Sequence, residues 1–231
     1  MIHRFWQLYT EWLSLECGII EYRMTITTTS TVKSRFKRLR KFLLWLFSFI
    51  LAGMLLLICF SPYGSHEGYS YKLVKETVVI NVPVDSVFRF LGNSDNAQKW
   101  SVYVDHIATL NSIRTPDGTP GSIRRCFCNK NEKGQRWDEL TTIVEPNKRR
   151  QLTTFNLIDF SMQANGLASE QRYRKLSDNQ CELTFSLFFA NHDPGFFDEF
   201  KTYFGAYKVR SIFRQNLSNI KRILETGNRS Y

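Results

Sequence analysis

Hydrophobic residues form one nearly continuous run near the start of the chain, in which Ser48 is the only clearly polar side chain, and alternate with polar residues over much of the remainder. The run covers residues 42–60, FLLWLFSFILAGMLLLICF, and contains no charged residue and no proline. A helix of this length spans about 28 Å, close to the hydrocarbon thickness of a bilayer, about 30 Å. We therefore predict a single transmembrane helix over 42–60. The alternative is a buried core helix, which the basic flank described next disfavours.

Basic residues precede this run and are missing just after it. Six lysines and arginines lie between residues 33 and 41, whereas the next basic residue after the run is Lys72. By the positive-inside rule, segment 1–41 is expected in the cytoplasm and residues 61–231 on the exported side, periplasmic or extracellular. The run exceeds the apolar region of a signal peptide, about 7–15 residues, and no small-x-small cleavage pattern follows it. The prediction is an uncleaved signal anchor in a single-pass membrane protein.

The N-terminal segment has two interpretations. Phe5, Tyr9 and Trp12 have helical spacing, which is typical of an amphipathic helix at a membrane surface. Alternatively, Met24 opens a Thr/Ser-rich run that leads into the basic cluster, the usual form of a short cytoplasmic head. In that case residues 1–23 are a mis-chosen extension and translation starts at Met24 instead of Met1.

After the anchor, the pattern indicates a linker over 61–71 (SPYGSHEGYSY) and a folded domain over 72–226. The domain begins with a strand whose apolar residues alternate, Val78, Ile80 and Val82. Two short helices follow, one from Asp85 to Gly92 and one from about Asp95 to Trp100.

Runs of strand character fill the middle of the domain, with short turn-rich pieces between them. They cover residues 107–111, 122–128, 136–144, 151–157, 167–176 and 181–189. Connections this short favour antiparallel neighbours, since a parallel crossover needs a dozen or more residues.

The period becomes helical near the C-terminus. Apolar residues recur at spacings of three and four from Phe200 to Leu224, which predicts one long amphipathic helix. A curved antiparallel sheet wrapped around this helix would bury its apolar stripe, so the predicted fold class is α+β.

Three motifs, in this order of elements, resemble the START-like superfamily, also called SRPBCC or polyketide cyclase/dehydrase-like. The resemblance extends from about Lys72 to Glu225. Its motifs are the junction Pro83-Val84-x-x-Val87-Phe88, Trp100 after the second helix, and Glu139 two residues after Trp137 and ahead of Glu145-Pro146. The resemblance implies the helix-grip fold, with a hydrophobic cavity between sheet and long helix that holds lipids, sterols, polyketides or similar molecules. A minority of such proteins are enzymes, and the superfamily has no single catalytic signature to transfer.

We accordingly predict a domain that binds a hydrophobic or amphiphilic small molecule on the exported side of the membrane, without a cofactor. The predicted cavity wall takes one face of each strand, Trp100 and the long helix. It comprises Val78, Ile80, Trp100, Phe127, Trp137, Phe155, Leu183, Phe185, Phe204, Tyr207 and Phe213.

Two other functions stay open. In a cyclase or dehydratase, a cavity carboxylate such as Glu139 would act as general acid or base, with a tyrosine or His106 as its partner. In a protein-interaction module, side chains would fill the core. The volume of the cavity separates this third possibility from the first two.

Charged residues also occur on one predicted strand, and their pattern does not indicate a catalytic or binding site. Glu170, Arg172 and Arg174 share one face of a strand, which predicts a solvated face with cross-strand ion pairs.

Metal binding and disulfides have little support in the sequence. The histidines have no metal-ligand spacing with one another or with cysteines, so no metal site is predicted. Cys126 and Cys128 face the same way on one strand and are poorly placed to bond each other. Buried thiols are expected, with a bond from one of them to Cys181 as the alternative.

The net charge of the chain does not indicate a further binding partner. Residues 1–63 contribute half of the net charge of +10, so the domain itself is only mildly basic. It has no nucleic-acid-binding motif, and an exported domain is not expected to meet nucleic acid. The membrane and a small molecule are thus the predicted partners, with the oligomeric state left open.

Overall fold

The computed structural model of the chain describes residues 30–160 and 164–227. The chain divides into two compact units, Met1–Gly53 and Met54–Tyr231. The interpretations of residues 1–23 and of Met24 lie outside the described residues.

Helix α2 (Ser30–Cys59) contains the apolar run. Within the described residues it is the one helix whose length and composition suit a membrane span, over Lys37–Cys59. Its large apolar side chains are exposed, for example Trp45 (77%) and Phe49 (78%). An apolar helix whose side chains find no protein partner differs from the core helix of a globular domain.

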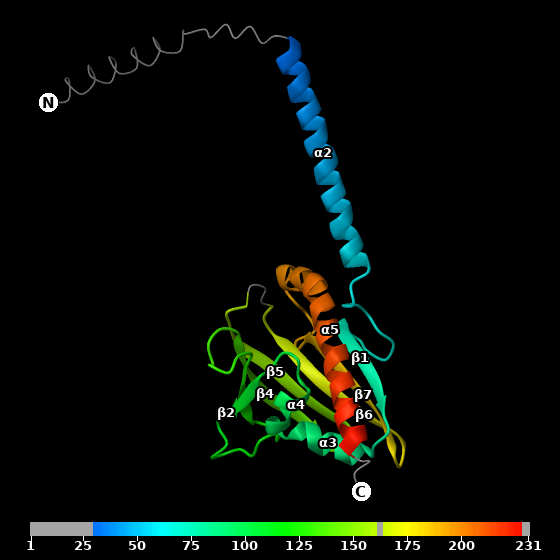
Figure 1. Cartoon of the computed structure of the whole chain (residues 1–231), viewed down its shortest axis with the longest axis vertical. Coiled ribbons are helices and arrows are strands. Elements are labelled where there is room, and N and C mark those ends of the chain that lie inside the picture. The colour runs from blue at the N-terminus through cyan, green and yellow to red at the C-terminus, as the bar shows by residue number, and fades with distance from the viewer. Residues whose placement is uncertain (1–29, 161–163, 228–231) are drawn as a thin grey trace, which may run out of the picture. The chain divides into compact units, whose positions relative to one another are not determined.

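The domain that follows is α+β, as predicted (Figure 1). Its elements are β1 (Leu73–Ile80), α3 (Val84–Gly92), the 3₁₀ helix η1 (Ser94–Asn96), α4 (Ala97–Trp100), β2 (His106–Thr109), β3 (Ile123–Phe127), β4 (Arg136–Glu145), β5 (Arg149–Ile158), β6 (Leu167–Ser177), β7 (Gln180–Phe189) and α5 (Phe196–Gly227). The short helices and the strand runs lie within a few residues of the predicted positions.

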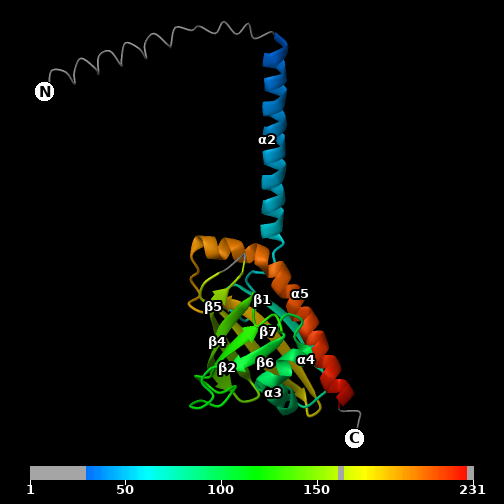
Figure 2. The same cartoon turned by 60° about the vertical axis from the view of Figure 1, so that its left-hand side comes forward.

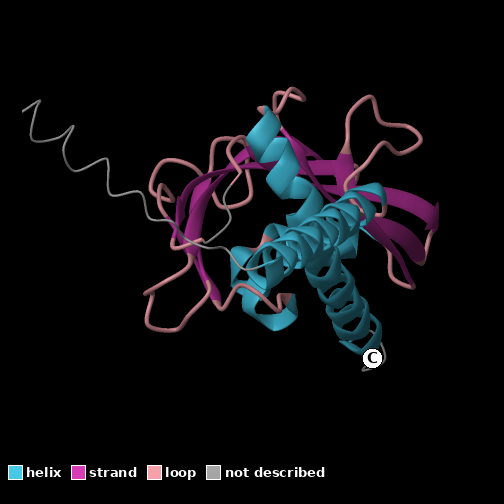
Figure 3. Ribbon diagram, turned by 90° about the horizontal axis from the view of Figure 1, so that it is seen from above, coloured by secondary structure: helices cyan, strands magenta, loops and turns pink. Residues whose placement is uncertain are grey.

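The seven strands form one antiparallel sheet in the order β1-β7-β6-β5-β4-β3-β2. Neighbours from β2 to β7 are consecutive in the chain, whereas β1 pairs with β7 at the other edge. Helices α3 and α4 therefore belong to the connection that leads from one edge to the other. The sheet is strongly curved, as the magenta strands of Figure 3 show.

Helix α5 covers the concave face of the sheet and bends along its length (Figure 2). Its C-terminal part packs, through Leu217 and Ile220, on β1, β7 and α3. We call the fully buried side chains of this region the packed cluster: Ile80, Val82, Val87, Leu91, Tyr173, Cys181, Leu183, Phe185, Leu217 and Ile220. The apolar stripe predicted from the sequence thus forms the core.

The segment predicted as a linker, 61–71, packs on the domain. Tyr63 is 3% exposed and lies in a cluster with Val74, Phe189 and Ala206. Tyr69 and Tyr71 pack on the convex face of the sheet, against Phe188 and its neighbours.

This packing corrects the prediction of a solvated face on β6 in part. Arg174 is exposed and pairs across strands with Glu182 at 2.9 Å, as predicted, but the other end of the face is covered. Glu170 is 1% exposed and forms ion pairs with Arg172 and Arg149, and the guanidinium of Arg172 lies over the Tyr69 ring. The Ser/Gly/Tyr-rich composition of residues 61–71 suggested a linker and contained no indication that this segment covers the convex face.

Candidate functional site

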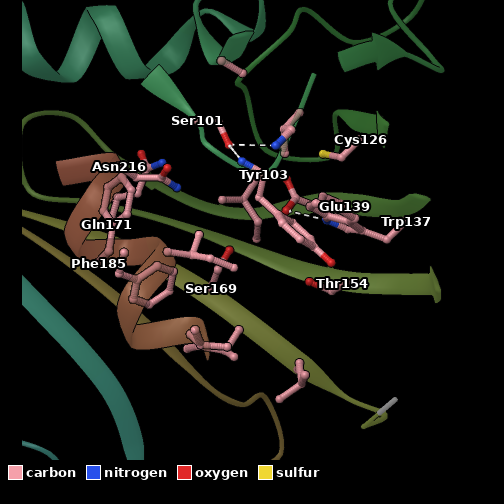
Figure 4. Close-up of a pocket in the computed structure, with 18 of the residues that line it drawn as sticks. Ser101, Tyr103, Cys126, Trp137, Glu139, Thr154, Ser169, Gln171, Phe185 and Asn216 are labelled. Atoms are coloured by element: carbon pink, nitrogen blue, oxygen red, sulfur yellow. Dashed lines mark hydrogen bonds between the residues drawn. The ribbon is translucent and has the colours of Figure 1, made fainter. Parts of the chain in front are cut away.

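A cavity of about 270 Å³ lies between the concave face of the sheet and the middle of α5 (Figure 4). Strands β2 to β7, α4, the segment after it and α5 all contribute to its wall. Its main lining residues are Trp100, Ser101, Tyr103, Val104, Ile107, Arg124, Cys126, Trp137, Glu139, Leu152, Thr154, Leu157, Phe160, Leu167, Ser169, Gln171, Phe185, Leu187, Val209, Ile212, Phe213 and Asn216.

Aromatic rings form two groups on this wall. Phe185 contacts Trp100 and Phe213, with ring centroids 5.9 and 5.8 Å apart, at the boundary with the packed cluster. Trp137 contacts Tyr103 and Phe160 at 6.0 and 5.9 Å. Aromatic side chains provide large, stiff apolar surfaces, so the wall suits an apolar ligand.

The strongest electrostatic feature of the wall is the ion pair between Arg124 and Glu139, on neighbouring strands β3 and β4. The guanidinium Nε donates to Glu139 Oε2 at 2.9 Å, and one terminal nitrogen lies 2.8 Å from the same oxygen in the ion pair. Trp137 Nε1 donates to the other oxygen, Oε1, at 2.9 Å. Burial opposes the charge of Arg124, but Glu139 outweighs it, and the pKa of the guanidinium is raised. Both carboxylate oxygens are therefore engaged by donors of the protein.

Several polar groups of the wall lack a partner among the described residues. Trp100 Nε1 is buried without an acceptor. Across the same part of the chain, no hydrogen bond engages the hydroxyls of Thr154 and Ser169, which Figure 4 shows at the cavity. A buried donor without an acceptor is costly, so a ligand that offers an oxygen would gain binding energy here.

Part of the predicted wall lies where the sequence placed it. Trp100, Trp137, Phe185 and Phe213 line the cavity, and so does the candidate carboxylate Glu139.

Three predicted wall residues lie beside the cavity instead. Ile80 and Leu183 belong to the packed cluster, and Val78 packs against it. They share the concave face with the true lining residues, but the C-terminal part of α5 covers them closely. A position on the concave face of the sheet is therefore not enough to place a residue at the cavity.

Two further predictions chose the wrong face of a strand. Arg124 and Cys126 of β3 line the cavity. Because side chains alternate between the two faces of a strand, Phe127 points to the convex face instead. On β5, Thr154 lines the cavity, and the side chain of Phe155 points to the convex face.

On α5, the predicted Phe204 and Tyr207 are also absent from the wall. Phe204 stacks on Phe200, with ring centroids 5.1 Å apart. Tyr207 is 38% exposed and its hydroxyl donates to the backbone carbonyl of Leu57 at 2.8 Å. The helix turns Val209 and Ile212 toward the cavity instead.

The second candidate for acid–base chemistry, His106, is not brought together with Glu139. Its ring stacks on Phe127 at 4.8 Å and its Nδ1 lies 3.0 Å from Asp105 Oδ2. The cavity wall does not include His106.

The cysteines that the structure describes are free. Strands β4, β5 and β6 separate Cys126 on β3 from Cys181 on β7. That is about 19 Å along the sheet, far beyond disulfide distance. Burial raises the pKa of the Cys126 thiol and raises that of Cys181 to about 11, which keeps both protonated and unreactive. Across the described residues, no group of three potential ligands could hold a metal ion.

Sequence reasoning missed many lining residues, among them Tyr103, Thr154, Leu157, Phe160 and Ser169. Strict alternation from Leu152 would have found Thr154, because residues two apart share a face. Leu157 breaks this alternation, since the register between β4 and β5 shifts here and the preceding Asn156 has a positive φ of 49°. Residues in loops, such as Tyr103 and Phe160, carry no periodic signal at all.

A curved antiparallel sheet that encloses a cavity under a long C-terminal helix defines the helix-grip class of α+β proteins. Residues 72–225 match the model of the family described as polyketide cyclase/dehydrase and lipid transport. The match covers about two thirds of the chain, and the chain belongs to this family.

Solved structures of low sequence identity share the fold. The protein XoxI from Bacillus cereus has a TM-score of 0.50 and 12% identity, covering 66% of this chain and 94% of its own. A protein from Nitrosospira multiformis has a TM-score of 0.52 and 10% identity, covering 68% and 99%. A protein from Thermobifida fusca has a TM-score of 0.50 and 14% identity, covering 64% and 90%. No curated protein gives a significant match.

Proposed function

We propose that this chain binds a hydrophobic or amphiphilic small molecule in the cavity under α5, and that α2 anchors it in a membrane with the domain on the exported side. The observation that carries the proposal is the cavity itself, about 270 Å³, with a mainly apolar wall beneath α5. Ligand pockets begin at about 300 Å³, so the cavity is close to the size a small ligand needs.

The chemistry of the wall supports an amphiphile in particular. The aromatic groups around Phe185 and Trp137 offer apolar contact. Trp100 Nε1, Thr154 and Ser169 offer donors that the described residues leave unused. A mostly apolar molecule with one or two acceptor oxygens would match both features.

The arrangement of Glu139 supports binding more than acid–base catalysis. A general base needs an oxygen within reach of a substrate proton. Arg124 occupies one oxygen of Glu139 and Trp137 occupies the other, and His106 lies elsewhere. The carboxylate is placed as the counter-ion of a buried arginine.

Filling the cavity tests the binding proposal. Thr154 lies on its wall, opposite Glu139 in the register of β4 and β5, and Thr142 is an exposed threonine on β4. The full chain and its Thr154→Trp and Thr142→Trp variants would be purified in mild detergent and extracted with organic solvent. Mass spectrometry would then quantify any bound small molecule per chain.

The expected result is one dominant compound near one per chain in the wild type and in Thr142→Trp, reduced at least about tenfold in Thr154→Trp because indole occupies its space. Equal amounts in both variants would place the compound outside the cavity and overturn the proposal.

The topology has its own test. C-terminal fusions to alkaline phosphatase, active only after export, and to green fluorescent protein, fluorescent only in the cytoplasm, would report the side of the membrane. We expect active phosphatase and a dark fluorescent fusion. The reverse pattern would contradict export.

A further inference from the structure

The first turns of α5 carry a row of phenylalanines that is exposed at its start and half-buried further along. We call Phe196, Phe197, Phe200 and Phe204 the aromatic ridge. Phe196 is 75% exposed and Phe197 is 74% exposed. Their rings contact each other with centroids 5.4 Å apart, and the contacts continue to Phe200 and Phe204 at 6.3 and 5.1 Å. Single exposed apolar residues are common on protein surfaces. Here two adjacent exposed rings continue into two half-buried ones, and a contiguous apolar patch of this kind marks an interaction site.

The chain connection holds the ridge near the end of α2. Ser61, two residues after the last residue of α2, donates from its hydroxyl to the backbone carbonyl of Tyr203 at 2.7 Å. Tyr63 adds a ring contact to Tyr203 at 5.3 Å. Two residues span at most about 7 Å, whatever the direction of α2. Phe196 lies seven residues before Tyr203, about 10 Å along the helix.

The charges beside the ridge are compensated. Asp198 pairs with Lys201 at 3.0 Å, and Glu199 pairs with Lys72 at 2.7 Å. Lone carboxylates in the first turn of α5 would resist contact with a bilayer. Paired with lysines, they add little electrostatic opposition to burying the neighbouring rings.

We propose that the aromatic ridge inserts into the exported surface of the same bilayer that α2 crosses, so that the domain rests on the membrane through the first turns of α5. This inference rests on the proposed membrane anchor. The ridge is within reach of the helix exit, it exposes rings of the kind that enter the interfacial region, and its acidic neighbours are paired.

Photochemical labelling from the lipid tests this proposal. The full chain would be reconstituted in phosphatidylcholine vesicles that contain a phosphatidylcholine with a diazirine on an acyl chain near the glycerol. After illumination, mass spectrometry maps the cross-linked residues. We expect cross-links within residues 42–60 and also within 196–204.

The double variant Phe196→Glu/Phe197→Glu is expected to lose the labels at 196–204 by about tenfold or more and to keep those in 42–60, because carboxylates replace rings that would be buried in lipid. Both positions are exposed, so the fold should persist, and circular dichroism checks it. The matched control is Ile113→Glu. Ile113 is fully exposed in the loop between β2 and β3. This loop packs on the end of α3, where Gly118 lies against Gly92, and it is not part of the aromatic ridge. This control should leave both groups of labels unchanged.

Each other outcome has a distinct meaning. Labels in 42–60 without labels in 196–204 would overturn the inserted ridge and leave the anchor intact. Labels in neither region would overturn the anchor and, with it, this inference. In a parallel reaction, a protein–protein cross-linker is added to the same vesicles without illumination. Cross-links between copies at the ridge, together with missing lipid labels there, would assign this surface to a second copy of the chain and overturn the lipid contact.

Discussion

Two regions beneath α5 share strands β6 and β7 and differ in how they are filled. Under the C-terminal part of the helix, Ile80, Leu183 and Ile220 are fully buried in the packed cluster. Under the middle of the helix, the facing surfaces leave a cavity of about 270 Å³. In the packed region aliphatic side chains surround Tyr173 and Phe185, whereas the wall of the hollow region combines the rings around Trp137 with an internal ion pair. This difference indicates that contacts among the wall side chains, the ring pairs and the Arg124–Glu139 ion pair, keep the cavity open.

The largest expected effect concerns the ion pair that supports the hollow region. Glu139→Gln leaves Arg124 charged and buried without its counter-ion, since the Arg124 side chain is only 12% exposed. We expect this to lower the free energy of unfolding by about 3–5 kcal/mol. Urea unfolding of the full chain in detergent, followed by circular dichroism, measures it. A loss below about 1 kcal/mol, typical of surface pairs, would show that the pair does not support the wall.

The next effect compares one truncation in each region. Ile220→Ala removes a fully buried side chain from the packed cluster and should cost about 2–5 kcal/mol. Ile212→Ala on the same helix removes a side chain that already borders open space, so it should cost roughly 1 kcal/mol. The same unfolding measurement compares them. Equal losses would indicate that both regions are equally packed and would break the comparison.

The converse change adds volume. Leu217→Trp in the packed cluster should cost about 1–3 kcal/mol or more, because no space is available. Thr154→Trp should cost less than about 1 kcal/mol in ligand-free protein, because the indole enters the cavity. Thermal unfolding of both variants after ligand extraction measures the difference. A larger loss for Thr154→Trp would contradict the assignment of free space beside this residue.

The smallest effect is on pH dependence and concerns the other face of β4. Burial raises the pKa of the Asp138 carboxyl, but hydrogen bonds from Arg125 and Asn156 outweigh this and lower it. Because the native pKa is below the unfolded value, the stabilisation is complete above the unfolded value and disappears as pH falls through the native one. Asp138→Asn should therefore be less stable than wild type at neutral pH and should lose less stability on acidification. Urea midpoints measured at decreasing pH test this; parallel curves would refute it.

The sequence predicted the order of elements because alternation and helical spacing record which side chains are buried. It placed Phe185 and Phe213 correctly at the cavity but also assigned Ile80 and Leu183 there. Periodicity reports the buried face and contains no information on how closely the opposite surface approaches. Phe155 was predicted on the cavity wall, although alternation from Leu152 points to Thr154 instead. The partners of Glu139 depend on which strands are neighbours, and that follows only from the folded sheet.

The most direct test of the account is the mass of the intact chain measured under native conditions after gentle release from detergent. The account predicts a species heavier than the 27.2 kDa chain by the mass of a single small molecule, which is lost on solvent extraction and regained when a single-chain amphiphile is added. A chain of unmodified mass that takes up no amphiphile would contradict it, because a hollow with unused polar donors would then hold no ligand.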